Sequence, residues 1–408
     1  MTRYVIIGAG IEGTTAAEEI RKRDETGEIV LIGEEEHTLY SRVLLPHYIK
    51  SKIPREKCFL KKETWYAEKQ IEYLRGERVK EIDTKNKHVV LLKAGREIPY
   101  DKLLITTGGE PRGVEENPRG VSYLQTLDDA DHLLQLLAEV AGNKEARAVV
   151  YGGGFIACEY LNIFKHFGLS TTCFFRGPWF WSRVLDEESG RLITETIEKN
   201  GVIVLSETTL KGVLGEQELA EIQTTRGEVR ASILGVGVGL ERDLSWITDA
   251  GIDIGSGVMT NAFLETNAPD VYSAGDIVEF EDAVTGKPMM GGNWTNALMQ
   301  GRAVGKTMAG ERTEYRLVTS YATNVFGLEI IFVGDTRRES SDEVVVRGER
   351  SSGYVVQLFL SKNRLIGATL IGGNADRMTI IKLIDQQIDL GLWREKLSNP
   401  GLSLKEIN

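Results

Sequence analysis

The sequence contains few cysteines and no cluster of cysteine and histidine. Its 408 residues include three cysteines, Cys58, Cys158 and Cys173, which are far apart in the chain. There is no CxxC or CxxxxC pair, so the sequence predicts neither an intrachain redox disulfide nor a structural zinc site. We therefore expect no metal site, and we expect a reducing compartment, the cytoplasm, as the location.

Long apolar runs and an excess of positive charge are also missing. No apolar stretch is long enough to span a bilayer, and the chain starts directly on a predicted strand rather than on a signal peptide. The formal net charge of −11 argues against nucleic acid as the main partner. The sequence thus predicts no membrane and no nucleic-acid partner. It leaves the oligomeric state open.

Glycine, by contrast, is abundant, with 44 residues. The apolar run Tyr4-Val5-Ile6-Ile7 reads as a buried parallel strand, and Gly8, Gly10 and Gly13 follow it before a predicted helix. A second apolar run leads to Glu34, which is suitably placed to bind a ribose. This order predicts a dinucleotide whose pyrophosphate lies at the helix N-terminus. The alternative is a plain glycine turn in a βαβ unit.

The same pattern occurs a second time. A predicted strand over residues 146–151 leads into Gly152-Gly153-Gly154-Phe155-Ile156-Ala157-Cys158-Glu159, with Ala157 as the third small residue. Two such units in one chain predict two bound dinucleotides, and the repetition is more specific than either copy.

The second unit ends differently from the first. Its next predicted strand ends in Phe175-Arg176, where a ribose-binding carboxylate is expected. An arginine at this place favours the 2′-phosphate of NADPH or tolerance of both nucleotides, and Arg183 is a second candidate for that contact. The alternative is that Arg176 only begins a solvated loop.

The remaining chain predicts an α/β protein with three domains. Three short runs between residues 71 and 92 read as a small side sheet, and a glycine–proline break near Pro111 marks a first boundary. A later strand ends in Gly275-Asp276, and from Glu311 on the pattern changes to short alternating strands. We expect two Rossmann-like dinucleotide-binding domains, the first formed by residues 1–112 and 241–312 and interrupted by the second, residues 113–240. An α+β domain of residues 313–408 follows.

Four motifs in this order resemble those of flavoproteins with two dinucleotide-binding domains, the glutathione-reductase-like superfamily. They are Gly8–Gly13, Thr106–Gly108, Gly152–Glu159 and Thr266–Asp276. The stretch Tyr40-Ser41-Arg42-Val43-Leu44-Leu45-Pro46 is similar to NAD(P)H:rubredoxin reductases, to the ferredoxin reductases of oxygenase systems and to the flavin module of assimilatory nitrite reductases.

The resemblance implies FAD in the first domain and NAD(P)H, as co-substrate, on the second. The residues that it implies for FAD are Gly8, Gly10, Gly13, Glu34, Arg42, Val79, Thr107, Gly108, Arg112, Asp276 and Trp294. Those that it implies for NAD(P) are Gly152, Gly154, Phe155, Ile156, Glu159, Arg176 and Gly237. For Trp294, which would lie beside the flavin ring, the alternative is a core tryptophan at a domain junction.

Two departures from the superfamily bear on the reaction. Disulfide reductases carry a CxxxxC pair, and some relatives carry one cysteine where this chain has Val43. Without that thiol, the flavin is expected to pass electrons directly to an acceptor. His47 stands where some relatives place a lysine near the flavin, and Glu159 matches the partner of that lysine. His47 and Glu159 are therefore the predicted catalytic residues, a structural histidine being the alternative.

The resemblance thus predicts an oxidoreductase that passes electrons from NAD(P)H through FAD to a small iron–sulfur carrier, rubredoxin or ferredoxin. One alternative is a flavoprotein of slow turnover that senses the nucleotide or serves as a subunit of a larger redox complex. Another is an NAD(P)H oxidase. A basic stretch between Arg42 and Lys57 is a candidate for steering an acidic carrier, and a solvated helix face is its alternative.

Overall fold

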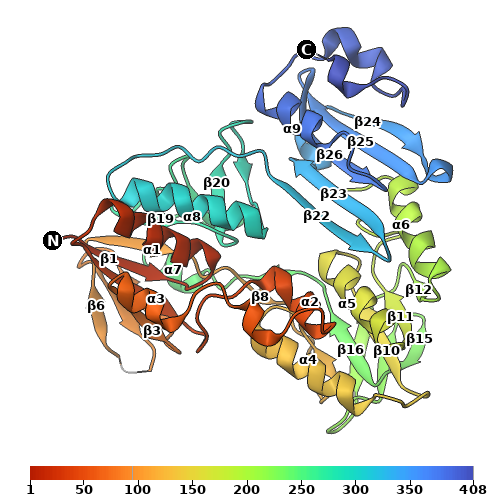
Figure 1. Cartoon of the computed structure of the whole chain (residues 1–408), viewed down its shortest axis with the longest axis horizontal. Helices are drawn as coiled ribbons and strands as arrows, with labels where there is room; N and C mark the ends of the chain where they lie inside the picture. The colour runs from red at the N-terminus through yellow and green to blue at the C-terminus, as the bar shows by residue number, and fades with distance from the viewer. Residues whose placement is uncertain (94, 408) are drawn as a thin grey trace. The chain divides into compact units, whose positions relative to one another are not determined.

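The computed structural model describes residues 1–93 and 95–407. The chain forms two units, and each combines segments that are far apart in sequence. Unit 1 contains Met1–Val43, Pro54–Glu110 and Glu241–Thr319. Unit 2 contains Leu44–Ile53, Pro111–Leu240 and the segment from Ser320 onward. In Figure 1 the ribbon is coloured from red at the N-terminus to blue at the C-terminus, so the segments can be followed by colour.

The centre of unit 1 is a parallel sheet in the order β19-β7-β1-β2-β3. In β1, Val5 lies opposite Val30 of β2 on one side and opposite Leu103 of β7 on the other. The inner strands are short apolar runs because both faces of the sheet are covered. The bounds are β1 (Arg3–Ile7), β2 (Glu28–Gly33), β3 (Ile71–Arg75), β7 (Lys102–Ile105) and β19 (Val271–Ser273).

The position of β3 differs from the sequence prediction. We expected residues 71–74 in the small side sheet, but β3 pairs in parallel with β2, with Ile71 opposite Ile29. As an edge strand it is partly exposed, so its residues lack the continuous apolar pattern of the inner strands. The side sheet contains only β4 (Val79–Asp83), β5 (His88–Leu91) and β6 (Glu97–Pro99).

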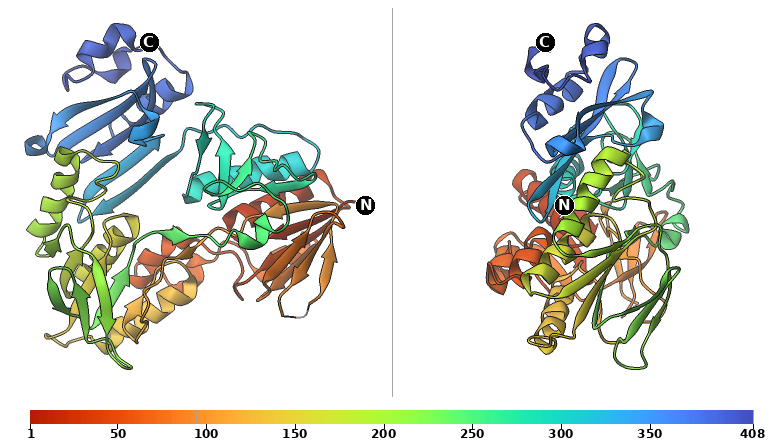
Figure 2. Two further views of the ribbon diagram at one scale, coloured as in Figure 1. Left: turned by 180° about the vertical axis from the view of Figure 1, so that it is seen from behind. Right: turned by 90° about the vertical axis from the view of Figure 1, so that its right-hand side faces the viewer.

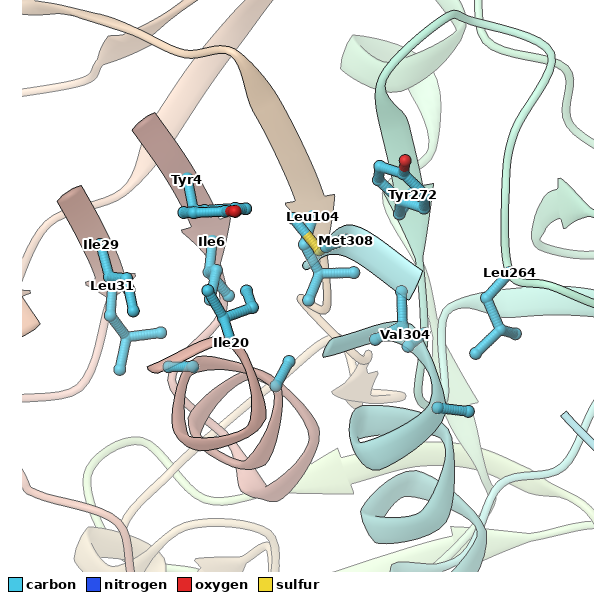
Figure 3. Packing of buried hydrophobic residues seen from close by; sticks show 14 of the residues in the cluster. Tyr4, Ile6, Ile20, Ile29, Leu31, Leu104, Leu264, Tyr272, Val304 and Met308 are labelled. Atoms are coloured by element: carbon cyan, nitrogen blue, oxygen red, sulfur yellow. The ribbon is translucent and has the colours of Figure 1, made fainter. Parts of the chain in front are cut away.

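Helices α1 (Ile11–Arg23) and α8 (Trp294–Met308) cover one face of the central sheet. Figure 3 shows Ile20 of α1 and Val304 of α8 in the buried cluster with Ile6 and Leu104 of the strands. The side sheet covers the other face. Further elements of this unit are η2 (Arg55–Cys58), α3 (Glu63–Glu68), α7 (Ser245–Thr248), β18 (Val258–Thr260), β20 (Val278–Glu281) and β21 (Pro288–Met289).

Unit 2 repeats the parallel architecture in the order β12-β11-β10-β16-β9. Its helix α4 begins at a capping box, in which Thr126 and Asp129 each bind the other's main-chain N–H. The bounds are β9 (Val121–Ser122), β10 (Arg147–Tyr151), β11 (Ser170–Phe174), β12 (Ile203–Leu205), β16 (Ile233–Val236), α2 (Leu45–Ile49), α4 (Leu127–Glu139), α5 (Phe155–His166) and α6 (Glu187–Lys199). A side sheet contains β13 (Leu210–Leu214), β14 (Glu221–Thr224) and β15 (Gly227–Arg230).

The C-terminal part of unit 2 is an antiparallel sheet in the order β22-β23-β26-β25-β24, with α9 packed on β23 and β26. Figures 1 and 2 show it in blue. Its elements are β22 (Ser320–Val325), β23 (Leu328–Gly334), β24 (Glu343–Glu349), β25 (Tyr354–Ser361), β26 (Arg364–Ile371), α9 (Arg377–Asp385), η3 (Arg338–Ser340), η4 (Arg350–Ser352), η5 (Gly391–Lys396) and η6 (Leu404–Glu406).

Short elements lie at three of the five points where the chain passes between the units: η1 (Arg42–Leu44), β8 (Glu110–Pro111) and β17 (Leu240–Glu241). In the described part of the chain, no helix has both the length and the apolar character that crossing a membrane requires. The fold is α/β with two parallel, Rossmann-like sheets, as the sequence predicts.

Candidate functional site

The glycine turn after β1 is closed to any side chain. Gly8 has φ +106°, and a Cβ atom there would overlap the main-chain oxygen of Thr106. A Cβ atom on Gly13 would overlap the main-chain oxygen of Gly8. Thr106 Oγ1 donates to that same oxygen at 2.9 Å, which joins the end of β7 to the turn. The turn therefore brings main chain, and not side chains, to the place where a pyrophosphate binds in such motifs.

The N-terminus of α1 is not capped by a side chain. Gly10 is its N-cap residue and has no side chain that could bind the N–H groups of the first turn. These N–H groups and the positive end of the helix dipole favour an anion.

The end of β19 supplies the predicted ribityl-binding carboxylate. Gly275 has φ +88°, and its N–H donates to Gln300 Oε1 at 2.7 Å. Arg242 Nε donates to the main-chain oxygen of Asp276 at 2.5 Å. Burial raises the pKa of the Asp276 carboxyl, while Arg242 and Arg42 act in the opposite direction.

Glu12 lies at the same turn and was not assigned a role from the sequence. Its carboxyl lies between Gly10 and Gly275, since Cβ atoms on these glycines would be 3.0 Å and 2.6 Å from its oxygens. Burial, and next the charge of Asp276, raise the pKa of Glu12 to about 7. The pairing with Asp276 could not be read from the sequence because 263 residues separate the two positions.

Four other residues predicted to bind FAD lie at the ends of strands or in the segments that follow them. Glu34, just after β2, is exposed and pairs with Arg78 at 3.2 Å. Arg42 Nη2 pairs with Glu35 Oε1 at 2.9 Å. Thr107 is exposed after β7, and Gly108 has φ +68°.

The three remaining residues predicted to bind FAD differ in burial and in the unit to which they belong. The Val79 side chain is buried in the core between the two sheets of unit 1, so only its main chain is available to a ligand. Arg112 belongs to unit 2, where its Nε donates to the main-chain oxygen of Leu240 at 3.2 Å. Trp294 is the first residue of α8 and is half-buried.

The polar groups around Asp276 fit a bound dinucleotide. Asn293 Nδ2 and Gln300 Nε2 are buried, and neither has a hydrogen-bond partner among residues 1–93 and 95–407. A buried amide donor without a partner is costly, and a ligand with many oxygens would satisfy it. Together with the glycine turn, these groups suit a pyrophosphate and a polyhydroxyl chain, which are parts of FAD.

The second glycine turn repeats the geometry of the first. Gly152 has φ +140°, and a Cβ atom there would overlap the main-chain oxygen of Gly237. Gly154 is the N-cap residue of α5 and leaves the first turn of that helix without a side-chain cap. A Cβ atom on Gly237 would lie 3.2 Å from the Ile156 side chain. The predicted residues Gly152, Gly154, Ile156 and Gly237 are thus brought together within unit 2.

An aromatic cluster surrounds Phe155, the first residue of α5. Its ring centroid lies 5.0 Å from Trp181, 5.2 Å from Tyr321 and 5.4 Å from Phe332. The main-chain N–H of Trp181 donates to the Gly153 oxygen at 3.2 Å, so the loop after β11 closes over the turn. Tertiary packing brings Tyr321 and Phe332 to this place from the C-terminal sheet.

The two arginines expected to bind a 2′-phosphate are both exposed. Arg176 follows the end of β11, and Arg183 lies in the loop that leads to α6. Neither forms an ion pair with any residue that the structure describes. Both guanidinium groups are therefore accessible to a ligand.

Glu159 has a basic neighbour, Lys50, that the sequence did not single out. Burial raises the pKa of the Glu159 carboxyl, and Lys50 acts against this rise. Thr323 Oγ1 donates to Glu159 Oε1 at 3.5 Å. His47 is largely exposed. The loss of water on its covered side, and next the positive charges of Lys50 and Lys52, lower the pKa of its imidazole. The structure thus brings Lys50, at the C-cap of α2, into electrostatic range of Glu159; Lys50 appeared in the sequence only as part of a basic stretch.

Comparison with protein families gives two matches along the chain. The family model described as pyridine nucleotide-disulphide oxidoreductase matches residues 2–301. The model described as the rubredoxin NAD+ reductase C-terminal domain matches residues 322–388.

Curated proteins and solved structures resemble the whole chain. It is 26% identical over 400 residues to nitrite reductase [NAD(P)H] of Bacillus subtilis (strain 168), covering 95% of this chain and 48% of that protein. The chain thus spans about half the length of that relative. It is 25% identical over 402 residues to rubredoxin-NAD(+) reductase of Acinetobacter baylyi, covering 95% of this chain and 99% of that one. A chain in the crystal structure of the covalent putidaredoxin reductase–putidaredoxin complex has a TM-score of 0.91 at 22% identity, covering 100% of this chain and 98% of that one.

Proposed function

The chain belongs to the pyridine nucleotide-disulphide oxidoreductase family, and we propose that it is an FAD-containing reductase that passes electrons from NAD(P)H to a small iron–sulfur carrier. Rubredoxin or ferredoxin is the proposed class of carrier, supported by the match of residues 322–388 and by the named relatives. The observation that carries the proposal is the pair of glycine turns, each of which exposes an uncapped helix N-terminus.

Unit 1 is the proposed site of FAD. The N-terminus of α1 would hold the pyrophosphate, Glu34 the adenosine ribose and Asp276 the ribityl chain. Val79 would contribute through its main chain, and Trp294 would lie beside the flavin ring. FAD, when bound, accepts a hydride and releases electrons singly. The protein supplies the binding, the orientation and the electrostatic surroundings. We propose residues 1–112 and 241–312 as the FAD domain, 113–240 as the NAD(P) domain and 313–408 as the C-terminal domain. This division differs from the two units at residues 44–53 and 111–112, which belong to unit 2.

Unit 2 is the proposed site of the nicotinamide nucleotide. The N-terminus of α5 would hold its pyrophosphate, and Gly237 leaves space beside Ile156. We propose a preference for NADPH, or tolerance of both nucleotides, because Arg176 and Arg183 are exposed and no carboxylate ends β11.

Direct transfer from flavin to carrier follows from the cysteine positions. Val43 is 57% exposed at the place where some relatives carry a thiol. Cys158 is fully buried, and burial raises the pKa of its thiol well above the usual value. A buried neutral thiol is a poor nucleophile. Buried cysteines are also compatible with a reducing cytoplasm, which is the location that we propose.

The first experiment is an anaerobic titration of the FAD-loaded protein with NADH and NADPH separately, followed by addition of oxidised rubredoxin or ferredoxin. We expect rapid bleaching of the flavin bands, at least as fast with NADPH as with NADH, and rapid reduction of the carrier. Slow bleaching with both nucleotides would instead support a nucleotide-sensing or subunit role. Fast bleaching with rapid reoxidation by oxygen, and no carrier reduction, would support an NAD(P)H oxidase.

A further inference from the structure

The carboxyl of Glu12 occupies an unusual place for a negative charge. Glu12 is the second residue of α1, is 8% exposed, and lies beside the N-terminus proposed to hold the FAD pyrophosphate. Its two oxygens lie against Gly10 of the glycine turn and against Gly275, which precedes Asp276. The carboxyl is therefore enclosed between the two main-chain segments that a pyrophosphate would approach.

Burial and the charge of Asp276 outweigh what favours an ionised Glu12, namely its own main-chain N–H, the positive end of the α1 dipole and the charge of Arg42. In the described part of the chain, no other side chain donates a hydrogen bond to its carboxyl. The charged groups that face it are Asp276, from the turn after β19, and Arg42, from η1. Arg42 already pairs with Glu35 at 2.9 Å. From helix α8, Gly301 lies against the Glu12 main chain, and the neutral Gln300 binds the N–H of Gly275.

A bound pyrophosphate would add two negative charges to this region. An ionised Glu12 would then repel both the phosphates and Asp276 in a site shielded from water. A neutral carboxyl removes this repulsion and can donate a hydrogen bond. We propose that Glu12 takes up one proton from solvent when FAD binds, so that FAD affinity depends on pH. This inference rests on the proposed FAD site.

The value near 7 for the pKa of Glu12 supports the proposal independently of the ligand argument. A carboxyl with that pKa is ionised above neutral pH in the cofactor-free protein. Binding an anion next to it raises the pKa further. FAD binding above pH 7 therefore requires a proton that is not already present.

The test measures the affinity of the FAD-free protein for FAD between pH 6 and 9, from the change in FAD fluorescence on binding. We expect a constant Kd up to about pH 6.5 and a rise approaching about tenfold per pH unit above pH 7.5. Glu12→Gln should bind with a Kd that no longer depends on pH in this range. Glu25→Gln, which changes an exposed carboxylate at the end of the same helix region, should behave like the unmodified protein.

Calorimetry in two buffers of different ionisation enthalpy counts the protons directly. At pH 8 the unmodified protein should take up about one proton more than Glu12→Gln on binding FAD. Equal uptake, or a Kd that is flat from pH 6 to 9 in the unmodified protein, would overturn the proposal. The second result needs no variant, so it decides the question even if Glu12→Gln fails to fold. Absence of FAD binding at every pH would contradict the proposed function instead.

Discussion

At several positions in unit 1, the space around the main chain limits which residue type can be accommodated. Gly8 and Gly13 pack main chain against main chain, and any larger residue would separate β1, α1 and β7. Glu12 stands between them, where the fold buries a carboxyl next to Asp276. At this scale the site combines positions that only glycine can occupy with a buried carboxyl whose pKa is raised to about 7.

Burial of Glu12 should also make the stability of the FAD-free protein depend on pH. Its pKa of about 7 in the folded chain lies above the ordinary 4.5. Between these values the unfolded chain loses its proton while the folded chain keeps it. The free energy of unfolding therefore falls as pH rises through this window, by about 3 kcal/mol in all.

Urea denaturation at pH 5 and pH 8 measures this effect. Between the two conditions, Glu12→Gln should lose about 2–3 kcal/mol less stability than the unmodified protein. Glu25→Gln is the control and should lose as much as the unmodified protein. A Glu12→Gln variant that loses just as much stability would show that the carboxyl titrates normally in the fold.

Among the elements, the contact between α1 and α8 is decisive for the first site. The two helices pack closely because Gly301 and Gly305 of α8 face the main chain of α1. This contact places Gln300 where it binds the N–H of Gly275, next to Asp276. The helix pair thus connects the packing of the core in Figure 3 to the geometry of the proposed flavin site.

Gly301→Ala tests this helix contact. A Cβ atom at this position would overlap the main-chain oxygen of Glu12, so α1 or α8 must shift. We expect a loss of about 1–3 kcal/mol in the free energy of unfolding, despite the better helix propensity of alanine. Gly212→Ala in β13 is a matched control, because its Cβ atom would lie 3.5 Å from Gln223, an ordinary contact. A stable Gly301→Ala variant would mean that the helices separate at little cost.

For the whole molecule, the net charge of −11 bears on how the chain would meet the proposed iron–sulfur carrier, which we expect to be acidic. Long-range repulsion would slow the encounter unless a local basic surface opposes it. In the basic stretch, Lys50 acts on Glu159, and Arg55 lies 5.8 Å from the Phe59 ring centroid. Lys52 and Lys57 are exposed and are therefore the better candidates for steering.

The double variant Lys52→Gln with Lys57→Gln should raise the KM for the carrier about two- to fivefold at low salt, with kcat unchanged. The difference should disappear at high ionic strength, because salt screens exposed charges. Lys85→Gln with Lys144→Gln changes the net charge equally at other exposed positions and should have little effect. Equal KM changes in the two double variants would assign the effect to net charge alone.

The sequence by itself determined the features that depend on local conformation and spacing. Both glycine turns, their helices and the parallel strands before them follow from positive φ angles, close main-chain approach and apolar runs, which neighbouring residues specify. The order of these motifs was also sufficient to indicate the superfamily, since the family match covers residues 2–301.

Only the tertiary structure decided which distant residues share a site. It placed β3 in the main sheet, Glu12 beside Asp276, Lys50 near Glu159, and Tyr321 against Phe155. Each of these pairings joins residues that are far apart in the sequence, and no local sequence pattern indicates that they meet. Burial then changes the charge state of a carboxyl such as Glu12, because the desolvation that raises its pKa exists only after the chain has folded.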